Sequence, residues 1–375
     1  MTMTTPKRDF FDHELAPGTE YQDIRYELRP LVGPEGGEVD GLFNAWIWLD
    51  NPRQYNSYTT RALCELILAL RQASNDPKVQ SVIFTAVGDK AFCTGGNTAE
   101  YSEHYAGRPD EYRRYMRLFN DAVSALMECD KPVINRVNGM RIGGGQEIGM
   151  ACDFTVAVDT ARFGQAGPKH GSAPVGGSTD FLPLFVGWAR ATASCTLCET
   201  WTAHQALDYG LINVIAPALK VDGKFIANPL VYITAEYDEF GLPLWGSMKS
   251  GAALQAGKEL MKSAEVDMSR LDAAVELLAY KLACTMPDCT TYTLENLRRH
   301  KLAQWDKNRE GNRAWLALNM MTEGKAGFRT FNRAPRAERE ADFLEMRRAL
   351  ADGAVWGDDF LKRFAPYAID GAEKA

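Results

Sequence analysis

The sequence contains no long apolar run, so nothing in it suggests a membrane-spanning helix or a secretory leader. The first twenty residues mix acids and bases without an apolar segment, which a signal peptide requires. The most lipid-like stretch, residues 181–198, is interrupted by Pro183, Gly187 and Arg190, which a membrane span disfavours. We therefore expect a cytoplasmic protein with no membrane partner.

Histidine is scarce and the cysteines are scattered, which leaves few ligands for a metal centre. The five histidines form neither HxxxH nor HxH pairs. Of the eight cysteines, only Cys195 and Cys198 have CxxC spacing, and neither a second CxxC nor a histidine at zinc-ligand spacing accompanies them. We therefore expect free thiols, with this pair as ordinary buried residues, and no metal site.

Positive charge is also in deficit. The 375 residues include 42 Lys and Arg against 49 Asp and Glu, which gives a formal net charge of −7. Nucleic-acid binders usually have the opposite sign, so no nucleic-acid partner is expected. The hydrophobic share of 46% and the charged share of 24% are ordinary for globular proteins, and the length allows about one to three domains.

Strand and helix patterns alternate between residues 44 and 217. Residues 44–50 alternate as a strand does, and Leu63, Leu66 and Leu70 then repeat at helical spacing. This alternation continues along the chain and predicts an α/β fold with parallel strand pairing. The further predicted elements are a helix over 112–127 and strands over 79–86, 131–139, 153–159 and 161–164.

The segments on either side of this region differ from it in composition. Residues 1–43 contain clusters of glycine and proline that are typical of an extended lead-in. Residues 218–257 mix glycine, proline and aromatic residues like an inserted excursion, and helical patterns follow over 271–283 and 315–321. From Arg333 onward, 17 of 43 residues are charged, which predicts a solvated or partner-facing tail.

Two glycine-rich segments each follow a predicted strand. They are GDKAFCTGGNTAEY at residues 88–101 and VNGMRIGGGQEIGMACD at residues 137–153. Glycine lets the backbone approach a ligand closely, and amides at the start of the predicted helix QEIGMA can stabilise negative charge. Neither segment has the GxGxxG or GxxxxGK[ST] spacing of nucleotide sites. Taken singly, each segment could be no more than a turn.

Together and in this order, the two segments resemble the crotonase (enoyl-coenzyme A hydratase/isomerase) superfamily. The motifs WLDNPRQYNS, ARFGQAGPKHG and ALDYGLINVIAP add to the likeness, and MTEGKAGFRTFN is similar to the family's C-terminal helical end. The resemblance implies a crotonase-like ββα spiral core over residues 44–217. An insertion and a C-terminal helical oligomerisation region would occupy residues 218–332, between an N-terminal extension (1–43) and a charged C-terminal tail (333–375).

The resemblance also implies a site for thioester chemistry. It places the family's two oxyanion-hole amides at Gly96 and Gly144, where they would hold the thioester oxygen as it becomes negative. Glu147 matches the first of the two glutamates with which hydratases activate water, and burying a glutamate in an apolar segment is costly unless it is paired or functional. The second glutamate position holds Gly167, which we expect to leave room for a larger acyl group or a water.

Another residue must then supply the second acid or base. Asp180 and His170 are the closest candidates in the sequence, although Asp180 could equally stabilise the first turn of a helix and His170 could be structural. Tyr101 and Tyr105 could shape the acyl pocket or simply pack in the core.

The substrate that the resemblance implies is an acyl-CoA thioester, and no cofactor is implied because CoA belongs to the substrate. Arg53 and Lys90 lie where family members contact the CoA nucleotide, although both could be solvated surface charges. The family further implies a homotrimer or a homohexamer.

Within the superfamily, long stretches such as GPKHGSAPVGGSTDFLPL are similar to ring-opening hydrolases. These enzymes hydrate the alkene of a cyclic 6-oxo-enoyl thioester and then cleave a carbon–carbon bond with a second water. The alternatives are a 2-ketocyclohexanecarboxyl-CoA hydrolase, a 1,4-dihydroxynaphthoyl-CoA synthase or an enoyl-CoA hydratase. A non-catalytic member that binds acyl-CoA or RNA is the alternative from another class.

Overall fold

The computed structural model describes residues 18–370, and its largest sheet has six strands in the order β1-β2-β3-β5-β7-β10. Strand β1 runs antiparallel to β2, and every other neighbouring pair in this sheet is parallel. The prediction of an α/β fold with parallel pairing is therefore confirmed. The strands are β1 (Ile24–Val32), β2 (Glu38–Leu49), β3 (Val79–Ala86), β5 (Val133–Val137), β7 (Phe154–Val158) and β10 (Val214–Ala216).

A second sheet of four strands, in the order β4-β6-β8-β9, is interleaved with the first along the chain. After β3 the chain forms β4, after β5 it forms β6, and after β7 it forms β8, so each repeat adds one strand to each sheet. This repetition is the spiral that the sequence predicts. Its strands are β4 (Ala91–Cys93), β6 (Met140–Ile142), β8 (Arg162–Gly164) and β9 (Thr200–Thr202).

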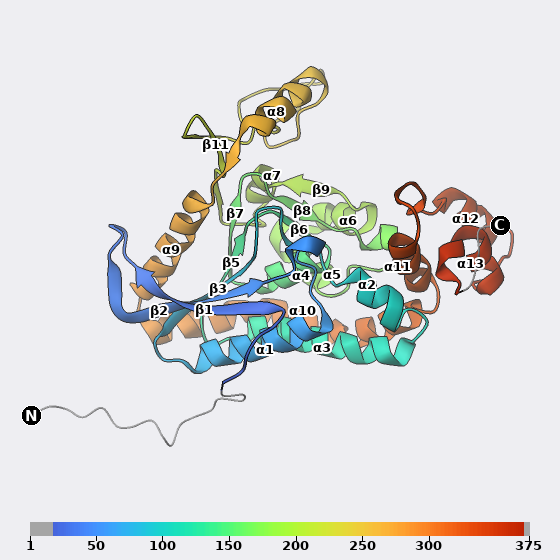
Figure 1. Ribbon diagram of the computed structural model, residues 1–375, viewed down its shortest axis with the longest axis horizontal. Coiled ribbons are helices and arrows are strands. Elements are labelled where there is room, and N and C mark those ends of the chain that lie inside the picture. The colour runs from blue at the N-terminus through green and yellow to red at the C-terminus, as the bar shows by residue number, and fades with distance from the viewer. Residues whose placement is uncertain (1–17, 371–375) are drawn as a thin grey trace, which may run out of the picture.

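Helices enclose both sheets, and α1, α3 and α10 lie together below the main sheet in the view of Figure 1. Helix α1 begins where the Thr59 hydroxyl accepts the Ala62 amide at 2.9 Å, and its buried leucines are those at the predicted helical spacing. The helices of the core are α1 (Thr60–Asn75), α2 (Thr98–Glu100), α3 (Pro109–Met127), α4 (Gly144–Ala151), α5 (Ser178–Val186), α6 (Trp188–Leu197), α7 (Ala203–Asp208), α9 (Ser269–Ala283) and α10 (Pro287–Asn319).

The prediction that residues before 44 form only an extended lead-in is wrong. Strand β1 buries Ile24 and Leu31 in the core, and the glycine cluster after it is the turn of a hairpin. In that turn Gly33 donates its amide to Gly37 at 2.8 Å. The glycines therefore mark a tight connection between paired strands, which their composition alone did not distinguish from a loose segment. Residues 1–17 of the predicted extension lie outside the described residues.

After Arg333 a solvated or partner-facing tail was predicted, and the solvated alternative is wrong for the part that the structure describes, while the partner-facing one stays a prediction. Helices α12 (Phe343–Ala351) and α13 (Asp358–Phe364) follow α11 (Glu323–Arg333) and form the lobe at the right of Figure 1. Phe360 and Leu361 are buried there, and Arg329 of α11 donates to the Ala368 carbonyl at 2.8 Å. The many charges lie on helices that still have one apolar face.

The predicted excursion leaves the core after β10 and projects at the top of Figure 1. It contains β11 (Leu219–Val221), β12 (Lys224–Ile226), α8 (Gly251–Ser263) and β13 (Glu265–Val266), and the three strands form a small antiparallel sheet. The predicted bounds, residues 218–257, are too short, because the projecting segment runs to the end of β13. Within residues 18–370, every helix is too short or too polar to span a lipid bilayer. All eight cysteines are free, as predicted, with Cys195 buried and Cys198 half-buried.

Candidate active site

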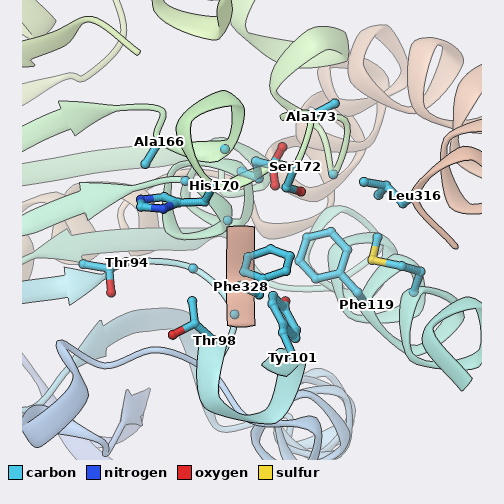
Figure 2. Close-up of a pocket in the computed structure, with 18 of the residues that line it drawn as sticks. Thr94, Thr98, Tyr101, Phe119, Ala166, His170, Ser172, Ala173, Leu316 and Phe328 are labelled. Carbon is cyan, nitrogen blue, oxygen red and sulfur yellow. The ribbon is translucent and has the colours of Figure 1, made fainter. Parts of the chain in front are cut away.

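A cavity of about 120 Å³ lies where the two glycine-rich segments meet, and Figure 2 shows side chains around it. The rings of Tyr101 and Phe328 pack against each other at 4.9 Å between centroids, while His170 lies on the side of Thr94 in this view. The cavity is lined by Tyr58, Thr94, Gly95, Gly96, Thr98, Tyr101, Tyr112, Met116, Phe119, Gly143, Gly144, Glu147, Ala166, Gly167, His170, Ser172, Ala173, Gly176, Leu316 and Phe328.

The sheet topology brings the two glycine segments together. Strands β4 and β6 are parallel neighbours, so the segments that follow them, Gly95–Gly96 and Gly143–Gly144, emerge at the same edge. The approach is so close that a Cβ atom on Gly95 would lie 3.0 Å from the Gly144 nitrogen. Gly95 and Gly143 also have φ angles of +104° and +60°, which side chains rarely allow. We call these four glycines the glycine wall.

Two backbone amides of the glycine wall are available to a ligand. Among the described residues, no carbonyl or side chain accepts a hydrogen bond from the amide of Gly96 or of Gly144. Gly144 is the first residue of α4, where amides lack partners within the helix and the helix dipole favours negative charge. The geometry therefore suits the stabilisation of an oxyanion, as the sequence predicts for these two residues.

Glu147 lies one turn into α4 and brings a carboxyl group to the same cavity. Its side chain is 7% exposed, and its Oε1 accepts the Ser178 amide at the start of α5 at 3.2 Å. Burial raises the pKa of Glu147 to about 8, against the opposing effect of the Ser178 and Gly176 amides. A carboxyl group with this pKa can exchange a proton with a water or a substrate near neutral pH.

Buried cations from two directions hold α4 in place. Lys301 of α10 donates to the carbonyls of Met150, Ala151 and Cys152 at 3.0, 2.9 and 2.9 Å, which satisfies the C-terminal end of the helix. The Arg141 guanidinium, fully buried behind α4, donates to the Gln146 side chain at 2.8 Å. These contacts fix the positions of Gly144 and Glu147 relative to the sheets.

The opposite side of the cavity contains the short turn Gly167–His170, where the family's second glutamate would lie. A Cβ atom on Gly167 would be 2.3 Å from the Ser172 carbonyl oxygen. The expectation that this glycine leaves free room is therefore wrong, because the Ser172 backbone occupies the space of the missing side chain. We call residues 167–172 the turn wall.

The structure separates the two candidates for the second acid or base. His170 lines the cavity from the turn wall. Its ring and that of Phe331 pack edge to face, with 4.9 Å between their centroids. Burial lowers the pKa of the His170 imidazole. Asp180 is 4% exposed in the first turn of α5 and does not line the cavity. Its Oδ1 accepts the Asn308 amide of α10 at 2.6 Å, and burial raises its pKa.

Arg53 and Lys90 are exposed in two turns that touch each other outside the cavity. Gly88 lies in the turn that contains Lys90, and Pro52 lies in the turn that contains Arg53. A Cβ atom on Gly88 would be 4.0 Å from the Cβ atom of Pro52. The Arg53 turn is linked to the cavity lining, because the Thr94 hydroxyl donates to the Tyr55 carbonyl at 3.5 Å. No ion pair forms at either cation within the described chain, and their contact with CoA stays a prediction.

Sequence reasoning missed the tyrosines that complete this cavity. Tyr101 lines it as expected, but Tyr105 does not, since its hydroxyl lies 2.7 Å from that of Thr60 on α1. Tyr58 and Tyr112 were not foreseen, and both line the cavity. The sequence places Tyr58 directly before a helix N-cap, but no spacing rule indicates where its hydroxyl points.

Comparisons with known proteins show which family this chain is similar to. A sequence model of the enoyl-CoA hydratase/isomerase family matches residues 44–228. A protein of Thauera aromatica named 6-oxocyclohex-1-ene-1-carbonyl-CoA hydrolase is 59% identical over 358 residues, which cover 95% of each chain. Proteins with the same name from Geobacter metallireducens and Syntrophus aciditrophicus are 56% and 44% identical, over 92% of this chain and 91% and 92% of theirs.

Solved structures share the fold at lower identity. An enoyl-CoA hydratase/isomerase of Xanthobacter autotrophicus has a TM-score of 0.61 at 23% identity, with 88% of this chain and 97% of that chain covered. An enoyl-CoA hydratase of Mycobacterium avium subsp. paratuberculosis has a TM-score of 0.59 at 19% identity, with 84% and 96% covered. These structures identify the crotonase fold and, at such identity, nothing finer.

Proposed function

Since this chain belongs to the enoyl-CoA hydratase/isomerase family, we propose that it is a 6-oxocyclohex-1-ene-1-carbonyl-CoA hydrolase, which opens the ring of its substrate with two waters. The observation that carries this proposal is the 59% identity to a relative of that name over 95% of both chains. The cavity supports it, because two free amides and one buried carboxyl group suit a reaction that forms a thioester enolate.

The first half of the reaction is hydration of the ring alkene. Glu147 takes a proton from the first water, whose oxygen adds to the alkene carbon β to the thioester carbonyl. The electron pair of the alkene moves onto the thioester oxygen, where the amides of Gly96 and Gly144 stabilise the negative charge. Protonation of the α-carbon then gives the hydroxylated ring.

The second half is hydrolytic cleavage of the ring. The second water attacks the ring ketone, and the bond between the ketone carbon and the α-carbon breaks. Its electron pair again enters the thioester enolate, so the same two amides serve both halves. The ketone carbon becomes a carboxylate as the second water gives up both of its protons. One of them balances the proton that the α-carbon gains, the other passes to solvent, and 3-hydroxypimeloyl-CoA is released.

Substrate binding and assembly complete the proposal. Arg53 and Lys90 lie on adjoining exposed turns, and we assign them to the CoA phosphates because cations there would pair with an anionic ligand. The family suggests a homotrimer or homohexamer, which sedimentation of the purified protein would distinguish. The protein acts in the cytoplasm on this proposal.

The function is tested by incubating the purified protein with 6-oxocyclohex-1-ene-1-carbonyl-CoA in oxygen-18 water. The proposal predicts 3-hydroxypimeloyl-CoA with one labelled oxygen in the hydroxyl group and one in the carboxylate. A sample without protein measures spontaneous exchange at the ring ketone, which would add further label. A product with an intact ring and a single label would reduce the protein to a hydratase, and unchanged substrate would refute the proposal.

A further inference from the structure

The hydroxyl of Tyr58 lies inside the cavity, beside the amide at the start of α4. A Cβ atom on Gly144 would be only 2.0 Å from this hydroxyl oxygen. The tyrosine is 3% exposed, yet its hydroxyl has no hydrogen-bond partner among the described residues. Because Tyr58 lines the cavity, this hydroxyl is open to a molecule bound there.

The backbone of Tyr58 is fixed to the glycine wall. Its amide donates to the Gly95 carbonyl at 3.0 Å, and its carbonyl accepts the Asn97 amide at 2.9 Å. Its ring stacks on Phe119 of α3, with 5.7 Å between centroids. The backbone contacts and the ring contact therefore hold the hydroxyl at a defined place beside Gly144.

Tyr58 differs in this respect from the other tyrosines of the cavity. The Tyr101 hydroxyl lies 2.6 Å from the Tyr115 hydroxyl, and Tyr112 also has a hydrogen bond with Tyr101. Those hydroxyl groups are hydrogen-bonded to one another, and the Tyr105 hydroxyl is hydrogen-bonded to that of Thr60. Of the three tyrosines that line the cavity, Tyr58 is the one whose hydroxyl has no hydrogen bond with another tyrosine.

Tyr58 is in the protonated state that a donor needs. Burial, with the nearby Tyr101 hydroxyl as the next cause, raises the pKa of Tyr58 well above its ordinary value, and the Glu147 carboxyl group adds to the effect. The Glu147 carboxyl group is thus close enough to favour the protonated form of Tyr58.

We propose that Tyr58 is the second acid of this site and gives the α-carbon of the substrate its proton. This inference rests on the proposed function, in which the α-carbon is protonated once in each half of the reaction. It also accounts for the absence of a glutamate at Gly167, because the acid is then Tyr58, which lies against the glycine wall and not in the turn wall.

The proton balance of the hydration half closes with these two residues. An O–H bond of the water breaks as its proton passes to the Glu147 carboxylate, and the carbon–oxygen bond forms. The enolate electron pair then forms a C–H bond with the Tyr58 proton, leaving a phenolate. Protonated Glu147 returns its proton to that phenolate, directly or through the second water, and both residues regain their starting states.

The experiment compares Tyr58→Phe with Tyr105→Phe, a matched loss of a hydroxyl group outside the cavity. Turnover of 6-oxocyclohex-1-ene-1-carbonyl-CoA is measured beside calorimetric binding of cyclohexanecarbonyl-CoA, whose ring has neither alkene nor ketone. We expect Tyr58→Phe to lower kcat by about 100- to 10,000-fold, the usual contribution of a general acid, with the Kd of the unreactive thioester changed by less than about threefold. Tyr105→Phe should retain both the turnover and the thioester binding of the wild type.

A second readout isolates the proton transfer. In deuterium oxide, the protein should exchange the α-hydrogens of 3-hydroxypimeloyl-CoA, because the same acid works in reverse. Tyr58→Phe should slow this exchange by about the factor by which it slows turnover, since one transfer limits both.

Each contrary result overturns the assignment. Turnover of Tyr58→Phe equal to that of Tyr105→Phe would remove Tyr58 from the chemistry. A parallel loss of thioester binding would make Tyr58 a packing residue, and slow turnover with unchanged exchange would place its role in another step. Wild-type protein that leaves the ring closed would refute the proposed function, and the wild-type assay separates that result from any effect of Tyr58.

Discussion

The glycine wall and the turn wall face the same cavity but contribute different groups to it. The glycine wall offers the amides of Gly96 and Gly144, and Glu147 and Tyr58 lie against it. The turn wall contributes backbone and the His170 ring, and α11 backs it so closely that a Cβ atom on Gly327 would lie 2.0 Å from the His170 carbonyl oxygen.

This difference indicates how a hydratase-like site can change its chemistry. In the turn wall, the backbone of Ser172 fills the place of a second glutamate at Gly167, so that side has no carboxyl group. We therefore assign the chemistry to the glycine wall and the fit of the ring to the turn wall. Substitutions on the two sides should differ in size and in kind.

The largest expected effect comes from a side chain in the glycine wall. Gly144→Val would place a Cβ atom 2.0 Å from the Tyr58 hydroxyl and block access to the amide. We expect turnover to fall by at least about 1,000-fold, more than the loss of one oxyanion donor usually costs, because the substitution also displaces Tyr58. Assays of substrate consumption measure this, with Gly311→Val as control, since that glycine has open space around it. Near-normal turnover in Gly144→Val would contradict the assignment.

The second-largest effect on turnover is expected from Glu147→Gln. The amide keeps the shape of the side chain but cannot take a proton from water, so kcat should fall by about 100- to 10,000-fold with little change in thioester binding. Glu295→Gln, an exposed change on α10, serves as the matched control. Glu147→Gln with wild-type kcat would exclude Glu147 as the base.

The pH dependence of the wild-type protein sharpens this assignment. Because burial raises the pKa of Glu147 to about 8, its carboxylate form, and with it kcat/KM, should increase up to about that pH. The folded chain also keeps this proton to a higher pH than the unfolded chain, so the Glu147 contribution to stability decreases as pH rises from about 4.5 to about 8. Across this pH window, the melting temperature of Glu147→Gln should therefore fall less than that of the wild type. Equal falls in the two proteins would contradict a raised pKa of Glu147.

A change in the turn wall should act on binding. His170→Gln removes the ring that packs on Phe331 but no group that we assign to the chemistry. We expect KM to rise by about three- to tenfold with kcat within about threefold, the pattern of lost uniform binding. Steady-state kinetics over a range of substrate concentrations separates the two constants. A loss confined to kcat would instead indicate that His170 takes part in the chemistry. The two walls would then not differ in function.

Asp180→Asn should have the smallest effect. The Asn308 amide can still donate to the new side chain, so we expect kcat to change by less than about threefold. The negative charge of Asp180 contributes to the raised pKa of Glu147, so its removal should move the rise of kcat/KM to lower pH. A 100-fold loss of kcat would instead identify Asp180 as the second acid.

The sequence predicted the repeating part of this molecule better than its additions. Strand β3 has the predicted bounds, residues 79–86, because a buried parallel strand is a short apolar run with clear ends. The hairpin turn at Gly33–Gly37 and the helices after Arg333 were missed, since glycine content and charge content resemble those of unstructured segments.

The candidate site divides in the same way. The resemblance to the family implies Gly96, Gly144 and Glu147 as site residues, and the parallel pairing of β4 and β6 brings their segments together. The free hydroxyl of Tyr58 and the filled space at Gly167 could not be predicted. Both depend on side chain and backbone positions that arise only when the two walls are assembled.

The central claim is that one pair of amides serves both halves of the reaction, and Gly144→Ala tests it most directly. Rapid-quench measurements would follow two separate starting compounds, the cyclic enoyl thioester and its hydrated ring. The account predicts that hydration and ring cleavage slow by similar factors relative to wild type, because both form the enolate at Gly96 and Gly144. If one half slowed while the other kept its wild-type rate, the two halves would not share an oxyanion site.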